Sequence, residues 1–294
     1  MPRAMVLCAG YGTRMRPLTE ERPKPLLPFG DRTLLEHVLE GLGREFLPAL
    51  VNAHHLPAVF IELTRGWDAI ADVMVESEIL GTAGGVAGAR GRLGPAPVVV
   101  TNGDVLARVS VDALLASTPR DGVCLAVAPR VLGAGTVGLG GRGEVVRLRG
   151  ERFGTEVASG DYVGTLGLGE EALAALPESG CLIGDVTLPL LRRGAGVVTL
   201  PVSGHWFAPG DGIGAYLDEH RAWLAERASS SYVAPDARVA SGVELVGSVI
   251  GAGATVSGVG RLEGVVVWPG ARAEAPLADA VVTTRGNVVR RPSD

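Results

Sequence analysis

The chain has 294 residues, of which 47% are hydrophobic and 20% charged, and its formal net charge is −5. This composition is typical of a globular protein with room for one large and one small domain; no apolar run approaches a membrane span, and the negative charge argues against nucleic acid as a partner. Cys8, Cys124 and Cys181 are scattered singly, and Met1-Pro2-Arg3 leads directly into an apolar run, so we expect a cytoplasmic protein without zinc or a signal peptide.

The apolar run over residues 4–9 predicts a buried parallel strand. It leads into Gly10-Tyr11-Gly12-Thr13-Arg14, where the glycines allow positive φ and bring backbone N–H groups close to an anion. The P-loop pattern is absent, and Met15 stands where the third glycine of a dinucleotide fingerprint belongs. The segment therefore predicts an anion-binding loop outside these two patterns.

Lys24 is the only lysine, since every other one of the 27 basic residues is arginine. Its neighbours Pro23 and Pro25 hold the backbone extended, so a single ammonium is presented from a stiff loop. A compact charge on a flexible stem differs from the planar fork of arginine. This pattern indicates a specific role for Lys24.

These residues read G-x-G-T-R-M-x-P-L-T followed by P-K-P, and the stretch resembles the signature of the sugar-1-phosphate nucleotidyltransferases. We call residues 10–25 the signature loop. The resemblance implies that Arg14 and Lys24 are catalytic and contact phosphate. It also implies a nucleotide site that includes the following residues: Leu7, Ala9, Gly10, Gly12 and Thr13.

Strand and helix patterns alternate after this loop, which predicts a parallel sheet with crossover helices. The expected helices cover residues 33–40, 54–64 and 86–92, and the expected strands cover 49–52, 72–76 and 97–101. His54 and His55 are adjacent and cannot share a helix face, so a structural role is favoured over metal binding.

The strand over residues 97–101 ends in Asn102-Gly103-Asp104. A carboxylate at the carboxyl end of a parallel strand points into the crevice where such sheets bind ligands, although a generic turn has the same sequence. The resemblance assigns Asp104 as a ligand of Mg²⁺, a hard cation that prefers oxygen. It also places Asn102 and Gly103 in the sugar site.

The segment Gly81–Gly85 resembles the loop of the family that contacts the nucleobase, with Gly81, Thr82 and Gly85 as binding residues. Glu76 or Glu78 just before it could accept two hydrogen bonds from guanine, whereas uracil offers one donor. Both acids also fit a solvated position near a helix start. The form L-G-T-A-G is closest to the mannose-1-phosphate guanylyltransferase branch.

The region 121–200 is less regular, with strands expected at 123–128, 145–148 and 162–168. In the family this half carries the sugar-phosphate pocket, and the resemblance implies roles for Gly164, Asp161 and Asp185. A second lysine that usually holds the sugar phosphate is missing, so Arg147 or Arg149 would replace it.

Residues 205–211 align with the family motif whose aspartate is the second carboxylate on Mg²⁺, and Ala208 occupies that place. Asp211 is then either a displaced metal ligand or the N-cap of a helix running through Tyr216 and Leu224.

Beyond Ser229-Ser230-Ser231, apolar residues recur mostly every six positions, and Gly247–Ile250 is echoed by Gly264–Val267. This rhythm resembles a short left-handed β-helix of about three coils. We therefore expect a Rossmann-like α/β domain over 1–228, with a mixed, mainly parallel sheet and helices on both faces. A left-handed parallel β-helix over 232–294 follows, and its open edge would be covered by the catalytic domain or by another subunit.

These features together predict a Mg²⁺-dependent enzyme that transfers a nucleotidyl group from a nucleoside triphosphate to a sugar 1-phosphate, with GTP and mannose 1-phosphate favoured. Three alternatives remain: the same reaction with UTP or another nucleoside triphosphate and a different sugar 1-phosphate, a non-catalytic or regulatory homologue that binds a nucleotide sugar, and acyl transfer by the β-helix. The last is weak, because such acyltransferases use a histidine base and none follows His220.

Overall fold

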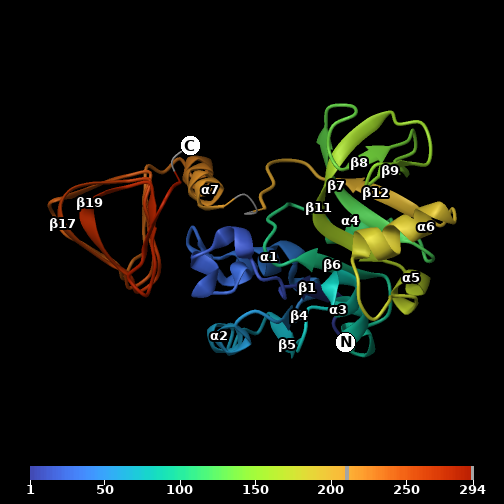
Figure 1. Ribbon diagram of the computed structural model, residues 1–294, viewed down its shortest axis with the longest axis horizontal. Helices are drawn as coiled ribbons and strands as arrows, with labels where there is room; N and C mark the ends of the chain where they lie inside the picture. Colours follow the sequence, from blue (N-terminus) through green and yellow to red (C-terminus); the bar gives the residue numbers. More distant parts are fainter. Residues whose placement is uncertain (209–211, 293–294) are drawn as a thin grey trace. The chain divides into compact units, whose positions relative to one another are not determined.

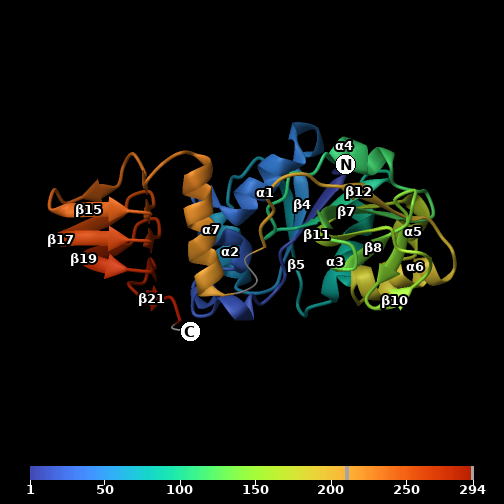
Figure 2. The ribbon, with the colours of Figure 1, turned by 90° about the horizontal axis from the view of Figure 1, so that it is seen from above.

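The computed structural model describes residues 1–208 and 212–292, which fall into two compact units. The sheet unit comprises Met1–Gly10 and His37–Phe207, and the coil unit comprises Tyr11–Glu36 together with the chain from Ala208 onward. Figures 1 and 2 show both units from two directions. The units divide the chain differently from the ranges 1–228 and 232–294, which remain predictions, because residues 11–36 group with the carboxyl-terminal strands.

The sheet unit is built on a mixed sheet of ten strands in the order β10-β9-β8-β11-β6-β1-β4-β5, with β7 pairing with β11 and β12. Strands β5, β4, β1 and β6 are parallel to one another, and β11 runs antiparallel to β6, β7 and β8. The strands are β1 (Ala4–Leu7), β4 (Ala49–Ala53), β5 (Ile70–Val75), β6 (Val98–Asn102), β7 (Val123–Arg130), β8 (Val137–Leu139), β9 (Val145–Leu148), β10 (Glu151–Arg152), β11 (Ala158–Leu168) and β12 (Val197–Pro201). The predicted mixed α/β sheet with a parallel core is confirmed.

Helices cover both faces of this sheet. Along β11, Leu166 and Leu168 join the buried core that also contains Val86 and Leu190 of two helices. Gly167 points the opposite way, and a Cβ placed on it would lie 3.5 Å from Leu115 of α4. The helices of the chain are α1 (Leu34–Leu42), α2 (Pro57–Leu63), α3 (Gly81–Ala89), α4 (Val111–Ala116), α5 (Glu170–Ala174), α6 (Leu188–Arg192) and α7 (Ile213–Glu226). No helix in the described ranges is long and apolar enough to cross a membrane.

Two predicted elements differ from the structure. The segment Gly81–Gly85, expected as a loop, forms the first half of α3, so the helix expected at 86–92 is only its second half. The helix expected from His54 begins at Pro57, because proline lacks the N–H that a first helical residue leaves unpaired.

In the coil unit, residues 11–36 fold into three 3-10 turns, a small hairpin and the first turn of α1. The turns are Thr13–Met15, Leu18–Glu20 and Lys24–Leu26, and the hairpin pairs β2 (Pro28–Phe29) with β3 (Arg32–Thr33). Thr33 and Glu36 form a capping box, in which the Thr33 N–H donates to Glu36 at 2.7 Å and the Glu36 N–H donates to the Thr33 hydroxyl at 3.2 Å.

The carboxyl-terminal strands before β21 stack in parallel as successive coils, and Figure 2 shows β15, β17 and β19 as aligned arrows. One row runs Tyr232, Val249, Val266, Val281, and Ile250, Val267 and Val282 form a buried apolar ladder. The strands are β13 (Tyr232–Val233), β14 (Arg238–Val239), β15 (Val243–Val246), β16 (Val249–Ile250), β17 (Thr255–Glu263), β18 (Val266–Val267), β19 (Arg272–Ala278), β20 (Ala280–Val282) and β21 (Val288–Arg290). The stacked coils fit the expected β-helix, whose left-handed sense stays a prediction.

The last coil is shorter than those before it. Between β17 and β19 the register shifts after Gly258, so that Gly258 pairs with Ala275 but Leu262 pairs with Leu277. Val259 in the longer corner is 76% exposed. The difference in length is thus confined to one corner of the coil.

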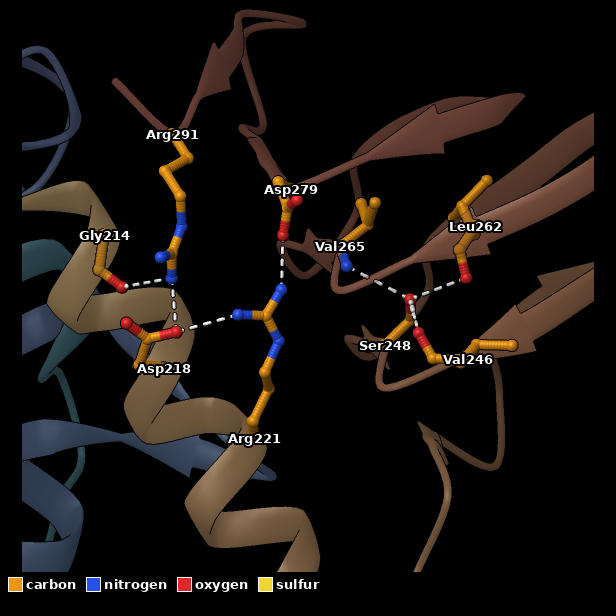
Figure 3. Close-up of polar contacts among 9 residues, drawn as sticks. All are labelled: Gly214, Asp218, Arg221, Val246, Ser248, Leu262, Val265, Asp279 and Arg291. Carbon is orange, nitrogen blue, oxygen red and sulfur yellow. Dashed lines mark hydrogen bonds and ion pairs between the residues drawn. The ribbon is translucent and has the colours of Figure 1, made fainter. Parts of the chain in front are cut away.

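Helix α7 is fastened to these coils by charged side chains, as Figure 3 shows. Arg221 pairs with Asp218 on its own helix at 2.7 Å and with Asp279 on the coils. Arg291 donates to Asp218 and, at 3.1 Å, to the Gly214 carbonyl. The buried Ser248 hydroxyl links neighbouring coils by accepting from the Val265 N–H at 3.1 Å and donating to the Leu262 carbonyl at 3.0 Å.

Candidate functional site

The carboxyl ends of β1 and β6 lie tightly together in the sheet unit. The Gly103 N–H donates to the Leu7 carbonyl at 2.9 Å, and a Cβ on Gly103 would stand 2.3 Å from the Cys8 sulfur. Only glycine fits this position, and Asp104 follows it directly. Burial, and secondly the charge of Asp104, raise the pKa of the Cys8 thiol well above its usual range. The Asp104 carboxylate is therefore held at the edge where parallel sheets bind ligands.

Gly164 lies in a bulge of β11 next to this strand end. The register of β11 against β7 shifts between Tyr162 and Leu166, and Gly164 adopts φ +75°. A Cβ there would be 2.8 Å from the Nδ2 atom of Asn102. The hydroxyl groups of the neighbouring Thr101 and Thr165 form a hydrogen bond of 2.7 Å. The structure thus brings together Asn102, Gly103, Asp104 and Gly164, four of the residues singled out in the sequence.

A second cluster forms around Asn52, which pairs with Leu7 across β4 and β1. Asn52 accepts from the Cys8 N–H at 2.7 Å and donates to Oε1 of Glu76 at 2.6 Å. The other oxygen, Oε2 of Glu76, is buried and has no hydrogen-bond partner among the described residues. Gly85 faces this pair, because a Cβ on it would lie 2.7 Å from Asn52 Nδ2 and 2.9 Å from Glu76 Oε1.

Asn52 was not singled out in the sequence, although an amide at the end of a buried apolar strand was a usable signal. Glu78, the other acid considered beside Glu76, is exposed. The buried, half-paired carboxylate is that of Glu76, so the two acids have different surroundings.

The glycines of α3 let this helix pack against a distant turn. A Cβ on Gly81 would meet the Gly180 carbonyl at 2.3 Å, and one on Gly84 would meet the Glu178 carbonyl at 2.5 Å. The Thr82 hydroxyl accepts from the Leu182 N–H at 2.8 Å, at the start of a π-helix over Leu182–Thr187. Packing at close range thus outweighs the poor helix propensity of glycine.

Two aspartates expected at the sugar site make contacts within the chain. Asp161 accepts from Arg130 Nε at 2.6 Å and from the Thr136 N–H at 3.1 Å, and Asp185 accepts from the Cys181 N–H at 2.7 Å. These bonds fix local turns. Sugar contacts by Asp161 and Asp185 stay predictions.

Arg147 and Arg149 have different surroundings. Arg147 binds Glu156 through two hydrogen bonds of 2.9 Å, and Ser159 donates to the same carboxylate at 2.6 Å. These two donors lower the pKa of Glu156 to about 2. Arg149 donates to the Cys181 sulfur at 3.3 Å and lies close to Gly184. Arg147 is thus engaged in an ion pair, and a sugar-phosphate contact by Arg147 or Arg149 stays a prediction.

The signature loop, except Gly10, lies in the coil unit. Gly12 has φ +62°, and a Cβ on it would meet the Thr19 methyl group at 2.8 Å and Lys24 Cβ at 3.0 Å. The Thr19 hydroxyl donates to the Gly12 carbonyl at 2.9 Å. The buried Met15 and Leu18 anchor the loop, whereas Thr13 and Arg14 are exposed. The fold therefore holds Gly12 against the stem of Lys24.

The metal ligands expected from the sequence are only partly described. Asp104 is described, whereas Asp211 lies outside the described residues. The described ranges contain no group of three or more His, Cys, Asp or Glu side chains able to hold a metal ion. Metal binding by Asp104 and by Asp211 stays a prediction.

Comparison with known proteins bears on these observations. Residues 3–128 match the model of the family described as nucleotidyl transferase. The match lies in the amino-terminal part of the chain. The matched range contains β1, the signature loop, Glu76, α3 and Asp104, so the candidate residues in these elements lie in the part that resembles nucleotidyl transferases.

The names of curated proteins similar to this part of the chain indicate different substrates. Over 140 residues the chain is 38% identical to N-acetylmuramate alpha-1-phosphate uridylyltransferase of Caulobacter vibrioides, covering 42% of this chain and 57% of the relative. Mannose-1-phosphate guanyltransferase of Schizosaccharomyces pombe is 37% identical over 111 residues, and that of Mycobacterium tuberculosis 35% over 116 residues. These two alignments cover 35% and 38% of this chain and 31% and 32% of the relatives, so each spans about a third of the curated protein.

Solved structures agree with the fold. HddC from Yersinia pseudotuberculosis aligns with a TM-score of 0.58 and 18% identity, covering 71% of this chain and 94% of HddC. The structure of the same protein complexed with GMP-PN aligns with a TM-score of 0.57 and 17% identity, and the coverage of both chains is the same. At this identity the similarity supports the α/β architecture alone.

Proposed function

We propose that the protein is a sugar-1-phosphate nucleotidyltransferase that uses GTP with mannose 1-phosphate or a related sugar phosphate. An oxygen of the sugar phosphate attacks the α-phosphorus of the nucleotide, the bond between the α- and β-phosphates breaks, and pyrophosphate leaves. No covalent protein intermediate is required, so catalysis rests on positioning and on neutralising charge.

The packing of the signature loop carries this proposal. Gly12 in a left-handed conformation touches the stem of Lys24, while Thr13 and Arg14 remain exposed. Backbone N–H groups around such a glycine and two cationic side chains suit a triphosphate. In the proposed reaction, Arg14 and Lys24 donate to phosphate oxygens and stabilise the charge that develops on them.

Mg²⁺ is the expected cofactor, with Asp104 as its protein ligand. One carboxylate at a strand end fits this ion, which keeps several waters and commonly takes its remaining oxygens from substrate phosphates. When bound, Mg²⁺ would supply positive charge next to the reacting phosphates. Asp104 and its rigid neighbour Gly103 would fix where that charge is held.

The surroundings of Glu76 support guanine over uracil. Asn52 fixes one carboxylate oxygen, and the second lacks a partner among the described residues. An unpaired buried acceptor costs about 1–3 kcal/mol, which a ligand donor would recover. Guanine presents two adjacent N–H donors on one edge, which match the two oxygens of a carboxylate.

Pyrophosphate release, measured with four nucleoside triphosphates against a panel of sugar 1-phosphates, tests the proposal. We expect turnover with GTP and with mannose 1-phosphate or a close relative. Turnover with UTP alone would instead favour the chemistry of the uridylyltransferase relative. Absence of turnover with every pair, together with tight binding of a nucleotide sugar, would favour a regulatory protein; Ala208 at the usual place of a carboxylate is the observation that keeps this second candidate.

A further inference from the structure

Two consecutive residues of the signature loop, Glu21 and Arg22, bind the last coil of the carboxyl-terminal strands. The Glu21 carboxylate is only 7% exposed. It accepts from the Thr283 hydroxyl at 2.6 Å, from Asn287 Nδ2 at 2.6 Å and from the Arg285 N–H at 3.4 Å. A buried carboxylate is costly unless it is hydrogen-bonded, and here every donor comes from the turn between β20 and β21.

Arg22 strengthens the same attachment. Its Nη2 donates to the Thr284 hydroxyl at 3.2 Å, and its guanidinium carbon lies 5.3 Å from the ring centroid of the fully buried Trp268. A guanidinium at this distance from an indole gains a cation–π attraction. Glu21 and Arg22, three and two residues before Lys24, therefore attach the chain to the last coil through one acidic and one basic side chain.

The chain after Lys24 is held by α7. The Tyr216 hydroxyl donates to the Pro28 carbonyl. A Cβ on Gly30, which has φ +62°, would overlap the indole of Trp223 at 2.2 Å, so backbone and ring are in direct contact. Helix α7 is itself fastened to the coils through Arg221 and Asp279 (Figure 3). The segment carrying Lys24 thus has supports on both sides, all from residues after 212.

We propose that the last coil positions the phosphate-binding loop and that Glu21 is the positioning residue that connects them. This inference rests on the proposed function, which gives Lys24 its phosphate role. It assigns the coils a part in setting turnover. Glu21 acts through the backbone of Lys24 and has no contact with substrate in this scheme.

Amide hydrogen exchange tests positioning without substrate. The N–H groups of Met15, Leu26 and Leu27 are bonded within the loop at 2.9, 2.8 and 3.1 Å, and report on its order. The full-length chain would be compared with Glu21→Ala and with Thr283→Val, which keeps the shape of the side chain and removes its donor. Glu20→Ala is the matched control, because Glu20 neighbours Glu21 and is exposed.

We expect exchange of these three amides to speed up on the order of tenfold in Glu21→Ala and several-fold in Thr283→Val, and to stay unchanged in Glu20→Ala. Unchanged exchange in both Glu21→Ala and Thr283→Val would overturn the proposal. Thr283→Val decides the question if Glu21→Ala does not fold, because its substitution is in the coils and conserves volume.

Kinetics separate positioning from mere stabilisation. A positioning role predicts a raised KM for the nucleotide and a lowered kcat in Glu21→Ala, with the same direction in Thr283→Val and recovery in Glu21→Gln, which keeps an acceptor for Thr283 and Asn287. The double variant Glu21→Ala/Thr283→Val should be no worse than Glu21→Ala alone. A lowered Tm with unchanged KM and kcat would reduce Glu21 to a structural residue and overturn the proposal.

The two proposals fail in different ways. If the wild-type protein releases no pyrophosphate with any nucleotide, the proposed function fails, and the exchange measurements still decide whether the coil orders the loop. If wild type and Glu20→Ala turn over equally and Glu21→Ala matches them, the proposed function stands and the positioning role is wrong.

Discussion

Gly164 faces the side-chain amide of Asn102 so closely that a methyl group on Gly164 would lie 2.8 Å from Nδ2. Asn102 ends β6 and directly precedes Gly103 and Asp104. The bulge in β11 and the end of β6 therefore lie close together. The side-chain amide of Asn102 can keep its position because Gly164 has no side chain.

Gly164→Ala should accordingly displace Asn102 and raise the KM for the sugar 1-phosphate. Because φ is +75°, alanine should also cost about 1–2 kcal/mol of folding stability. Urea unfolding and steady-state kinetics measure the two effects. Gly141→Ala is the control, since Gly141 has open space around its Cα; equal behaviour of the two variants would show that the bulge has no role in the site.

Lys24→Ala should lower the rate by on the order of 10²–10³, because one charge contact to a transferring phosphoryl group is lost. The fold should persist, as judged by circular dichroism and Tm, and Lys24→Arg should also be poor because its fork has a different geometry. The exposed Arg65→Ala serves as the comparison for loss of one positive charge. Near-wild-type turnover in Lys24→Ala would contradict the assigned role.

Glu76→Gln should reduce the preference for GTP over UTP, because an amide NH₂ next to guanine donors replaces an acceptor. A site built around such hydrogen bonds discriminates strongly against bases that lack the matching donors. The ratio of kcat/KM for GTP and UTP is the measurement, with the exposed Glu62→Gln as reference. A ratio that is the same in both variants would show that Glu76 does not read the base.

The fold should lose stability in acid through Glu156. Its folded-state pKa is lowered from 4.5 to about 2 by Arg147 and Ser159, so its stabilisation is complete above pH 4.5 and is lost as the pH falls toward 2. Glu156→Gln should be less stable than wild type at neutral pH, and the difference should shrink over this range. Urea denaturation midpoints at pH 7, 4 and 3 measure it; a gap that stays constant would contradict the shift.

Asp104→Asn should abolish turnover, whereas Asp112→Asn, on the exposed side of α4, should not change it.

If Asp104 is the one indispensable protein ligand, Asp211→Ala should be mild and Ala208→Asp should lower the Mg²⁺ concentration needed for half-maximal rate. Magnesium titrations of the four variants measure this. Equal damage from Asp211→Ala and Asp104→Asn would instead make Asp211 the second ligand.

The strands that carry the site could be predicted because their signals are local. The apolar runs ending at Leu7, Asn52 and Asn102 gave the parallel core, since continuous burial leaves a continuous apolar sequence. The helical state of Gly81–Gly85 could not be predicted from the sequence, because it depends on contact with Glu178 and Gly180, almost a hundred residues away.

The support of the signature loop was hidden for a similar reason. Glu21 looks like one of two adjacent solvated acids, and partners such as Thr283, 262 residues later, distinguish it from Glu20. The partners of Asn52 likewise could not be recognised from the sequence, because its hydrogen bonds to Cys8 and Glu76 form only in the folded protein. Local pattern predicts elements well, whereas these polar pairs arise from the tertiary arrangement.

The uneven corner of β17 and β19 also bears on how the coils can change in length. The register shift separates Gly258–Ala275 from Leu262–Leu277, and the strands on either side remain paired. The longer coil has two more residues there, an even number, so inward and outward side chains stay in phase across the corner. An odd change would turn the buried Leu262 outward. This corner is thus where duplication or deletion can vary a coil in pairs of residues while the stacked interior keeps its sequence pattern.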